Sequence, residues 1–396
     1  MSASSKLPPF DPADPLGVDD LLEPEDLAVR DTVRRWAADR VLPYVAEWYE
    51  KGELPGIREL AKELGALGAL GMSLEGHGCA GASAVQYGLA CLELEAADSG
   101  IRSLVSVQGS LAMYAIHRFG SEEQKREWLP RMAAGEVIGC FGLTEPDHGS
   151  DPASMRTYAR RDGADWVLDG RKMWITNGSV AGVAVVWART DDGIRGFVVP
   201  TDRPGFSAPE IRHKWSLRAS VTSELVLDGV RLPADAMLPE ATGLKGPLSC
   251  LSHARYGIVW GAMGAARASF EAALEYARSR EQFGRAIGGF QLTQAKLADM
   301  AVELHKGILL AHHLGRRMDA GRLRPEQVSF GKLNNVREAI GICRTARTVL
   351  GANGISLEYP VMRHATNLES VLTYEGTVEM HQLVLGKALT GLDAFR

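Results

Sequence analysis

The chain lacks any long hydrophobic run, since no stretch of its 396 residues contains the ~18 consecutive apolar residues that a membrane-spanning helix needs. Its opening segment, MSASSKLPPFDPADP, also lacks the apolar core of a secretory signal and the arginine-rich composition of a transit peptide. These absences predict a cytoplasmic protein that does not insert into a membrane.

Cysteine is scarce and follows no pairing pattern. The cysteines are odd in number and far apart, and none stands in a CxxC spacing: Cys79, Cys91, Cys140, Cys250 and Cys343. This distribution favours buried, reduced thiols over a disulfide framework or a zinc site. The adjacent His312 and His313 would point about 100° apart on a helix, which makes them poor joint ligands. We therefore expect no metal.

Charge of one sign is not in excess. The formal net charge is −5 and the two signs are interspersed, so no basic patch of the kind that binds nucleic acid is present. With 396 residues the chain is too long for one ordinary hydrophobic core, and two or three domains are expected.

Three kinds of pattern follow one another along the chain. Helical periodicity occupies residues 1–139, β-branched and aromatic runs occupy 140–247, and helical periodicity returns over 248–396. We predict an α+β protein with an N-terminal helical domain, a middle antiparallel β domain and a C-terminal helical domain with these boundaries.

Asp-Gly pairs separate several of the predicted strands. They are Asp169-Gly170, Asp192-Gly193 and Asp228-Gly229, and each is flanked by β-forming residues. Because Asp-Gly favours the tight turns of hairpins, we expect a β-hairpin at each of the three pairs.

The segment GHGCAG (76–81) has the glycine spacing of a dinucleotide-binding loop. That fingerprint needs a strand before it and a helix starting within it, whereas helical segments lie on both sides here. We interpret it as a glycine-rich connection between helices.

Glu375 lies on a short turn, TYEGT (373–377), that precedes an amphipathic helix. Thr377 is a plausible N-cap for that helix. A lone turn glutamate is more often a solvated surface residue than a catalytic base. The rest of the chain must decide between these two interpretations.

Several further segments stand out together: FGLTEPDHGSD (141–151), WITN (174–177), REQFG (280–284), LGANG (350–354) and YEGT (374–377), with Gln291 at a helix start. In this order they resemble the acyl-CoA dehydrogenase flavoproteins. The resemblance extends from about residue 20 to 396, and it implies that the C-terminal helices form a four-helix bundle. It also implies FAD as the cofactor, a homotetramer, and electron-transfer flavoprotein as the electron acceptor.

The resemblance implies which residues hold FAD. One set would surround the flavin ring: Phe141, Leu143, Thr144, Ser150, Trp174, Ile175, Thr176, Thr377 and Phe395. A second set would hold the adenosine and pyrophosphate, on a neighbouring subunit: Arg280, Phe283, Gln291, Leu350, Gly351, Ala352, Asn353 and Gly354. Arginine suits phosphate, and glycine allows close approach of the backbone.

The resemblance also gives Glu375 its role, as the base that removes a Cα proton from an acyl-CoA thioester. Within the family, the segments DSGIRS (98–103), KWSLRAS (214–220), ARYGI (254–258) and RHATNLE (363–369) are similar to the members that act on glutaryl-CoA. The implied substrate contacts are Glu95, Arg102, Ser103, Ser106, Ser150, Arg255, Tyr374 and Gly376.

Arg102 is the residue that indicates a dicarboxylic substrate, because a terminal carboxylate needs a cation and hydrogen-bond donors. Taken alone it would read as a surface arginine at a helix end. Glu95 and Tyr374 are typical of the decarboxylating enzymes, so the resemblance implies conversion of glutaryl-CoA to crotonyl-CoA and CO2.

Three alternatives stay open: a non-decarboxylating enzyme or one for another acyl-CoA, an oxidase that uses oxygen, and a non-catalytic nucleic-acid-associated relative. The chain also departs from common family residues at Asp147-His148, Ser252-His253 and Ala352. The second departure lies near the expected CoA contacts.

Overall fold

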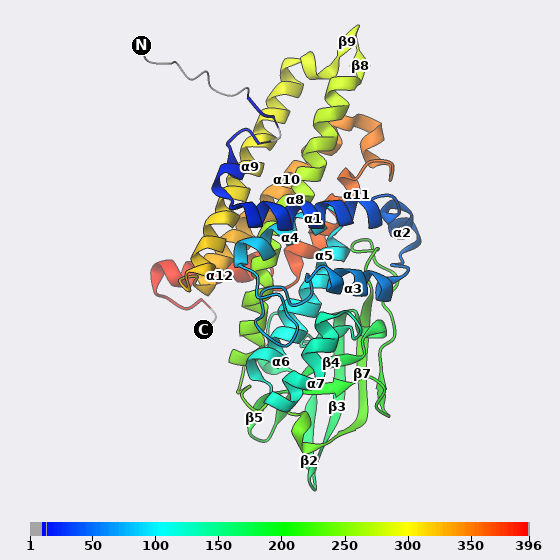
Figure 1. Ribbon diagram of the computed structural model, residues 1–396, viewed down its shortest axis with the longest axis vertical. Helices are drawn as coiled ribbons and strands as arrows, with labels where there is room; N and C mark the ends of the chain where they lie inside the picture. Colours follow the sequence, from blue (N-terminus) through cyan, green and yellow to red (C-terminus); the bar gives the residue numbers. More distant parts are fainter. Residues whose placement is uncertain (1–9, 13, 395–396) are drawn as a thin grey trace.

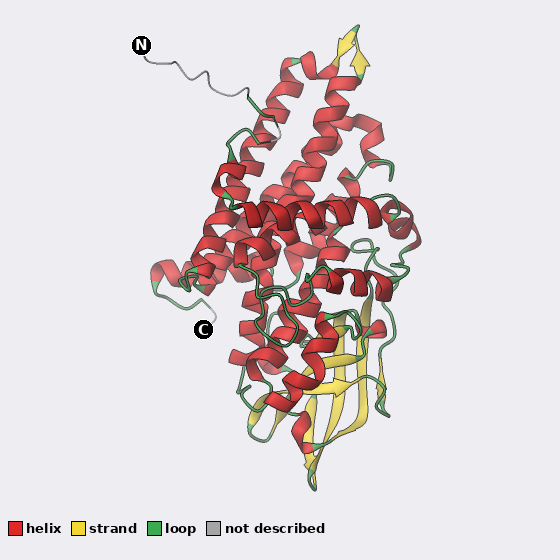
Figure 2. Cartoon of the chain, in the orientation of Figure 1, coloured by secondary structure: helices red, strands yellow, loops and turns green. Residues whose placement is uncertain are grey.

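The computed structural model describes residues 10–12 and 14–394, and Phe395 lies outside this range. Helices form most of the molecule, and the main sheet lies toward one end of its longest axis (Figure 1 and Figure 2). A small two-stranded hairpin lies at the opposite end. This arrangement confirms the predicted α+β class.

The N-terminal part is helical. Its helices are α1 (Pro24–Arg40), α2 (Val45–Lys51), α3 (Ile57–Ala66), α4 (Ala84–Ala97), α5 (Ser99–Ser106), α6 (Tyr114–Phe119) and α7 (Glu122–Ala133), with a π-helical segment η2 (Val107–Met113) between α5 and α6. Two N-caps explain helix starts that matter below. Ser83 accepts a hydrogen bond from Gln86 N–H at the start of α4, and Asp98 accepts one from Gly100 N–H at the start of α5.

The main sheet contains β1 (Gly139–Gly142), β2 (Tyr158–Asp162), β3 (Asp165–Thr176), β4 (Val183–Thr190), β5 (Gly193–Pro200), β6 (Phe206–Ser207) and β7 (Thr222–Leu232). The strand order is β1-β4-β2-β3-β7-β6, with β5 also paired to β4. All pairings are antiparallel except those of β4 with β1 and β2, which are parallel. The sheet is therefore mixed, although most of it is antiparallel as predicted.

Only one of the three predicted Asp-Gly hairpins forms. Asp192-Gly193 lies at the β4–β5 turn, where Thr190 pairs with Gly193. The other two predictions are wrong, because β3 and β7 run straight through their Asp-Gly pairs. Asp169 faces Asp228-Gly229 in a bulge, and Gly229 N–H donates to Asp169 Oδ1 over 2.7 Å.

A hairpin that the sequence reasoning missed joins β2 to β3. Asp162 pairs with Asp165, so Gly163 and Ala164 form a two-residue turn, and Gly163 has φ +66°. The sequence signal was present, since Asp162-Gly163 is another Asp-Gly pair.

The C-terminal part consists of α8 (Lys245–Ser279), α9 (Gln291–Asp319), α10 (Pro325–Leu350), α11 (Val361–Thr373) and α12 (Val378–Thr390). A two-stranded hairpin, β8 (Glu281–Gln282) and β9 (Arg285–Ala286), joins α8 to α9 at the far end of the molecule (Figure 1). No helix among the described residues is long and apolar enough to cross a membrane.

Three hydrophobic cores hold these parts together. One lies within the helices and includes Trp260 and Met263, and the other two cover opposite faces of the sheet. Because side chains alternate along a strand, Trp187 of β4 enters the core beside α6 and α7 while its neighbour Val186 enters the other. The helices thus pack directly on the sheet, and side chains from helices and strands meet where the two are in contact.

Candidate active site

The turn between α11 and α12 carries Glu375. Helix α11 ends at Thr373, and Thr377 caps α12 by accepting a hydrogen bond from Met380 N–H over 3.3 Å. This confirms the predicted turn and cap. Glu375 has φ +52° and Gly376 has φ +100°. A non-glycine residue in this region costs on the order of 1–3 kcal/mol, so the surrounding structure must hold it there.

Three backbone carbonyls of this turn are held by side chains from elsewhere. Arg255 Nε, on α8, donates to the carbonyl of Glu375 over 2.5 Å. Lys332 Nζ, on α10, donates to the carbonyl of Gly376 over 2.6 Å and also to that of Tyr374. The turn is therefore fixed from two helices.

The carboxyl group of Glu375 lies in the environment of a general base. Its Oε2 is buried and has no hydrogen-bond partner within the described residues. Burial raises the pKa of Glu375, while the charges of Arg102, Lys332 and Arg255 act in the opposite direction. A raised pKa makes the carboxylate a stronger proton acceptor. The surface interpretation of Glu375 does not describe this environment.

Arg102 is fully buried, not at the surface. Its side chain is 1% exposed, its Nε donates to Glu95 Oε2 over 2.6 Å, and Nη2 donates to the hydroxyl of Tyr374. Glu95 is 0% exposed and also accepts from Ser99 Oγ over 2.9 Å. The predicted Glu95, Arg102 and Tyr374 are thus brought together next to Glu375.

A junction at Asp98 places Arg102. The carboxylate of Asp98 caps α5 and accepts hydrogen bonds from Arg363 Nη1 over 2.5 Å and Asn367 Nδ2 over 3.0 Å, both on α11. One buried acidic side chain therefore ties the helix that carries Arg102 to the helix that leads to Glu375.

A glycine on α8 makes room for the arginine pair. A Cβ at Gly261 would lie 2.0 Å from Glu95 Oε2 and 3.3 Å from Arg102 Nε. Only glycine lets α8 approach this closely.

Of the three serines predicted to contact the substrate, two are buried and one is exposed. The hydroxyls of Ser103 and Ser106, on α5, are buried and have no hydrogen-bond partner of good geometry among the described residues. Buried polar groups of this kind normally have a partner, and the neighbouring hydroxyls are those of Tyr374, beside Ser103, and Tyr87, beside Ser106. Ser150 is exposed, on the loop that follows β1.

Most of the first predicted FAD set lies on or directly after strands of the sheet, whereas Thr377 of the same set lies at the start of α12. Phe141, Leu143 and Ile175 are buried, and Thr144 and Thr176 are half-buried. Trp174 is 58% exposed and has φ +63°, which turns it out of the regular strand. An exposed aromatic face beside hydroxyl groups and an apolar floor fits a planar flavin ring.

A buried ion pair supports this region and was missed by the sequence reasoning. Lys172 Nζ donates to Glu145 Oε1 over 2.9 Å and to the carbonyl of Leu143 over 3.1 Å. Burial acts to raise the pKa of Glu145, but the backbone N–H of Arg156 and the charge of Lys172 outweigh it and bring the pKa to about 2. Glu145 therefore stays ionised.

The second predicted FAD set lies elsewhere, around the β8–β9 hairpin and the end of α10. Arg280, Gln291, Gly351, Ala352 and Asn353 are exposed, and Phe283 is 94% exposed with φ +52°. Asn353 Nδ2 donates to Tyr276 Oη over 3.0 Å, while Leu350 and Gly354 are buried. The hairpin and the sheet lie toward opposite ends of the molecule (Figure 1).

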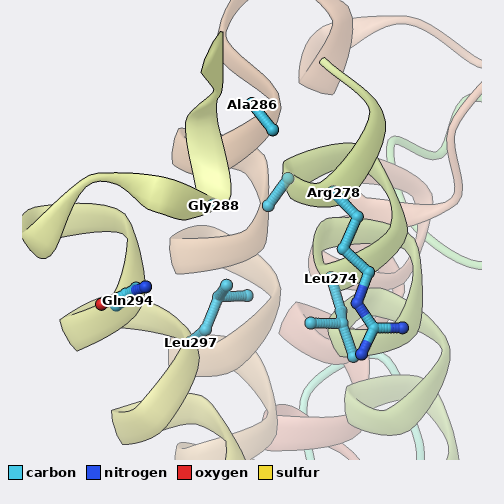
Figure 3. A pocket seen from close by; sticks show the side chains of 7 residues that line it. Leu274, Arg278, Ala286, Gly288, Gln294 and Leu297 are labelled. Atoms are coloured by element: carbon cyan, nitrogen blue, oxygen red, sulfur yellow. The ribbon is translucent and has the colours of Figure 1, made fainter. Parts of the chain in front are cut away.

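A cavity of about 430 Å³ lies beside the second set, between α8 and α9. Leu274, Arg278 and Leu297 are among its lining residues, and Figure 3 shows them on facing helices. None of the residues around Glu375 lines this cavity.

The cysteines and histidines form no reactive centre among the described residues. No group of three or more His, Cys, Asp or Glu side chains there could hold a metal ion. Burial raises the pKa of Cys91, Cys140, Cys250 and Cys343 to about 12, which keeps these thiols protonated.

Comparisons with known proteins agree with this geometry. Models of the acyl-CoA dehydrogenase N-terminal, middle and C-terminal domains match residues 23–136, 140–230 and 241–390. A crystal structure of glutaryl-CoA dehydrogenase from Mycobacterium smegmatis is 73% identical, with a TM-score of 0.96, and the match covers 97% of this chain and 99% of that one.

A second structure, of a glutaryl-CoA dehydrogenase from Mycobacterium smegmatis in complex with FADH2, is 65% identical over 98% of this chain and 100% of that one, with a TM-score of 0.96. The human mitochondrial short-chain specific acyl-CoA dehydrogenase is 35% identical over 361 residues, or 89% of this chain and 87% of that protein. The fold and site define a flavoprotein oxidoreductase whose cofactor is FAD. The chain belongs to the acyl-CoA dehydrogenase family.

Proposed function

We propose that this enzyme oxidises glutaryl-CoA and decarboxylates the product to crotonyl-CoA and CO2. One observation carries the proposal: buried Arg102 is joined through the hydroxyl of Tyr374 to the turn that presents Glu375. A buried cation and a carboxylate on which its charge acts thus lie in one cluster, as recognition of an acyl chain with a terminal carboxylate would require. The two Mycobacterium smegmatis glutaryl-CoA dehydrogenase structures support the same substrate.

Glu375 would act twice on the substrate. Its carboxylate first removes a proton from Cα, and the Cβ hydrogen leaves with its electron pair as hydride. FAD, when bound, supplies the acceptor for that hydride. After the terminal carboxylate leaves as CO2, protonated Glu375 returns a proton to the remaining dienolate, which completes crotonyl-CoA. The backbone N–H of Glu375 would meanwhile donate to the thioester carbonyl and stabilise the enolate.

Arg102 would bind the terminal carboxylate through the donors that Glu95 and Tyr374 leave available, together with the hydroxyls of Ser103 and Ser106. Glu95 keeps the arginine in place. A charge-assisted hydrogen bond of this kind contributes about 1.5–3 kcal/mol. Arg255, Gly376 and Ser150 would contact the thioester and CoA portion of the substrate.

The FAD contacts would come from two subunits. Phe141, Leu143, Thr144, Ser150, Trp174, Ile175, Thr176 and Thr377 would hold the flavin portion, and Arg280, Phe283, Gln291 and residues 350–354 would hold the nucleotide portion of a neighbour's cofactor. The separation of the β8–β9 hairpin from the sheet supports this division. It needs an oligomer, for which we propose a homotetramer in the cytoplasm, with the domain boundaries 1–139, 140–247 and 248–396.

The test is product analysis. Purified holoenzyme is mixed with glutaryl-CoA and an artificial electron acceptor, and flavin bleaching, CO2 and the acyl-CoA product are measured. Crotonyl-CoA and CO2 in equal amounts support the proposal. Glutaconyl-CoA without CO2 would replace it with the non-decarboxylating reaction, and preference for a monocarboxylic acyl-CoA would remove the substrate assignment. Rapid peroxide formation would replace electron-transfer flavoprotein with oxygen as the acceptor.

A further inference from the structure

Lys332 is a buried lysine in the middle of α10, and no motif in the sequence drew attention to it. Its side chain is only 2% exposed. Its Nζ donates to the carbonyls of Tyr374 and Gly376, which lie on the two sides of Glu375, and it lies 5.8 Å from the centre of the Tyr374 ring. A single ammonium group thus holds the peptide unit that precedes Glu375 and the one that follows Gly376, while Arg255 holds the unit between Glu375 and Gly376.

These two hydrogen bonds bear on the strained backbone. Glu375 has positive φ, and in a non-glycine residue such a conformation persists only when its surroundings enforce it. The carbonyls of Tyr374 and Gly376 are bound to the same amine, and the carbonyl of Glu375 between them is bound to Arg255, so these peptide planes cannot rotate independently. Lys332 therefore helps to set the direction of the Glu375 backbone N–H, which belongs to the same peptide unit as the Tyr374 carbonyl.

The charged groups around Lys332 also link it to Glu375. The groups that face Lys332 are Glu375 on the turn, Arg255 on α8, Arg102 on α5, His381 on α12 and the Tyr374 phenol. Burial lowers the pKa of Lys332, and among these neighbours Glu375 is the one whose charge favours the ammonium form. Glu375 is therefore the counter-charge of Lys332, and Lys332 is one of three cations, with Arg102 and Arg255, whose charges favour ionised Glu375.

The other neighbours do not titrate near neutral pH. Burial, with the charges of Lys332 and Arg255, lowers the pKa of His381 to about 3, so this histidine is neutral. Burial raises the pKa of Tyr374 to about 12. The two arginines stay charged. Glu375 and Lys332 are the groups of this cluster that can change charge between these limits.

We propose that Lys332 is a positioning residue for the dehydrogenation: its ammonium clamps the carbonyls on both sides of Glu375 and keeps the base ionised and correctly aimed. The inference rests on the proposed function, because it assigns Glu375 the role of base. The fold uses a similar clamp at Lys214, whose Nζ donates to the carbonyls of Leu217 over 2.9 Å and Ser220 over 2.8 Å, away from Glu375. Lys214 therefore offers a matched control.

The test compares pH profiles of kcat/KM for glutaryl-CoA in the wild type, Lys332→Gln, Lys332→Met and the control Lys214→Met. Loss of a nearby positive charge should move the acid limb upward by about one unit or more in both Lys332 variants. Gln retains a donor for one carbonyl, so kcat should fall less in Lys332→Gln than in Lys332→Met. Lys214→Met should leave the acid limb at the wild-type pH.

A second measurement needs no substrate. Because Lys332→Met removes one of the cations that stabilise ionised Glu375, adding Glu375→Gln should restore the melting temperature and flavin content toward those of Glu375→Gln alone. An acid limb unchanged in both Lys332 variants, or no thermal coupling between positions 332 and 375, overturns the proposal. If the wild type oxidises no acyl-CoA, the proposed function fails instead, and the thermal coupling still decides whether Lys332 and Glu375 act as a pair.

Discussion

Replacement of Arg102 by methionine should separate substrate recognition from folding. Arg102 is 1% exposed and its partner Glu95 is 0% exposed, so the substitution leaves a buried carboxylate with only the hydroxyl of Ser99 as its donor. Breaking a buried ion pair from one side costs about 3–5 kcal/mol. We expect Arg102→Met to lower the free energy of unfolding by that amount, measured on the holoenzyme by urea titration.

The double variant Arg102→Met/Glu95→Gln should recover most of this stability, because no buried charge is left unpaired. The double variant should not recover the preference for a substrate with a terminal carboxylate. A lost charge-assisted bond of about 1.5–3 kcal/mol predicts a roughly 10- to 150-fold lower ratio of kcat/KM for glutaryl-CoA to that for butyryl-CoA. The assay is the initial rate with an artificial electron acceptor for both substrates.

The control is another ion pair, between Glu93, which is 1% exposed, and Arg267, which is 16% exposed; their Oε2 and Nη2 atoms are 2.6 Å apart. Arg34 Nη2 also donates to Glu93 Oε1, over 2.9 Å. Arg267→Met should reduce stability and leave the ratio of the two substrates unchanged. If Arg102→Met lowers the rates with glutaryl-CoA and butyryl-CoA by the same factor, Arg102 does not recognise the terminal carboxylate, and the dicarboxylic assignment is refuted.

Three further predictions follow from the same site. Glu375→Gln should retain the flavin absorbance but lose bleaching by glutaryl-CoA, with turnover reduced roughly 10²- to 10⁴-fold, and unchanged turnover would remove Glu375 as the base. Because the reaction needs ionised Glu375 and burial raises its pKa above 4.5, wild-type kcat/KM should fall as the pH drops through that raised value; an acid limb at or below 4.5 would contradict the desolvation argument. Gly261→Ala should cost about 1–3 kcal/mol, seen as a lower melting temperature, since its Cβ would lie 2.0 Å from Glu95 Oε2, and an unchanged melting temperature would show that α8 can move aside.

The order of helical and strand regions could be predicted because it depends on local periodicity. The turn at Glu375 and its cap at Thr377 were predictable for the same reason, since capping is decided within a few residues. The bulge between Asp169 and Asp228-Gly229 could not be predicted in this way. An Asp-Gly pair has the same sequence in a turn and in a bulge, and only the partner strand decides which forms.

Lys332 and the Asp98 junction could not be predicted from local pattern. Lys332 reaches carbonyls 42 and 44 residues away, and Asp98 binds side chains 265 and 269 residues away. Family resemblance pointed to Arg102 and Glu95, but not to how completely they are buried. Phe395, predicted to complete the flavin site, lies outside the described residues.

The Asp98 junction has a consequence for substrate length. It locks α5, which carries Arg102, to α11, which ends at the turn of Glu375, so the gap between cation and base cannot stretch without breaking buried bonds from Asp98 to Arg363 and Asn367. If the proposed substrate lies between Arg102 and Glu375, this rigid junction should make the enzyme favour one length of the dicarboxylic acyl chain over chains one carbon shorter or longer. The carboxylate of Asp98 would thus influence which chain length is accepted without contacting the substrate.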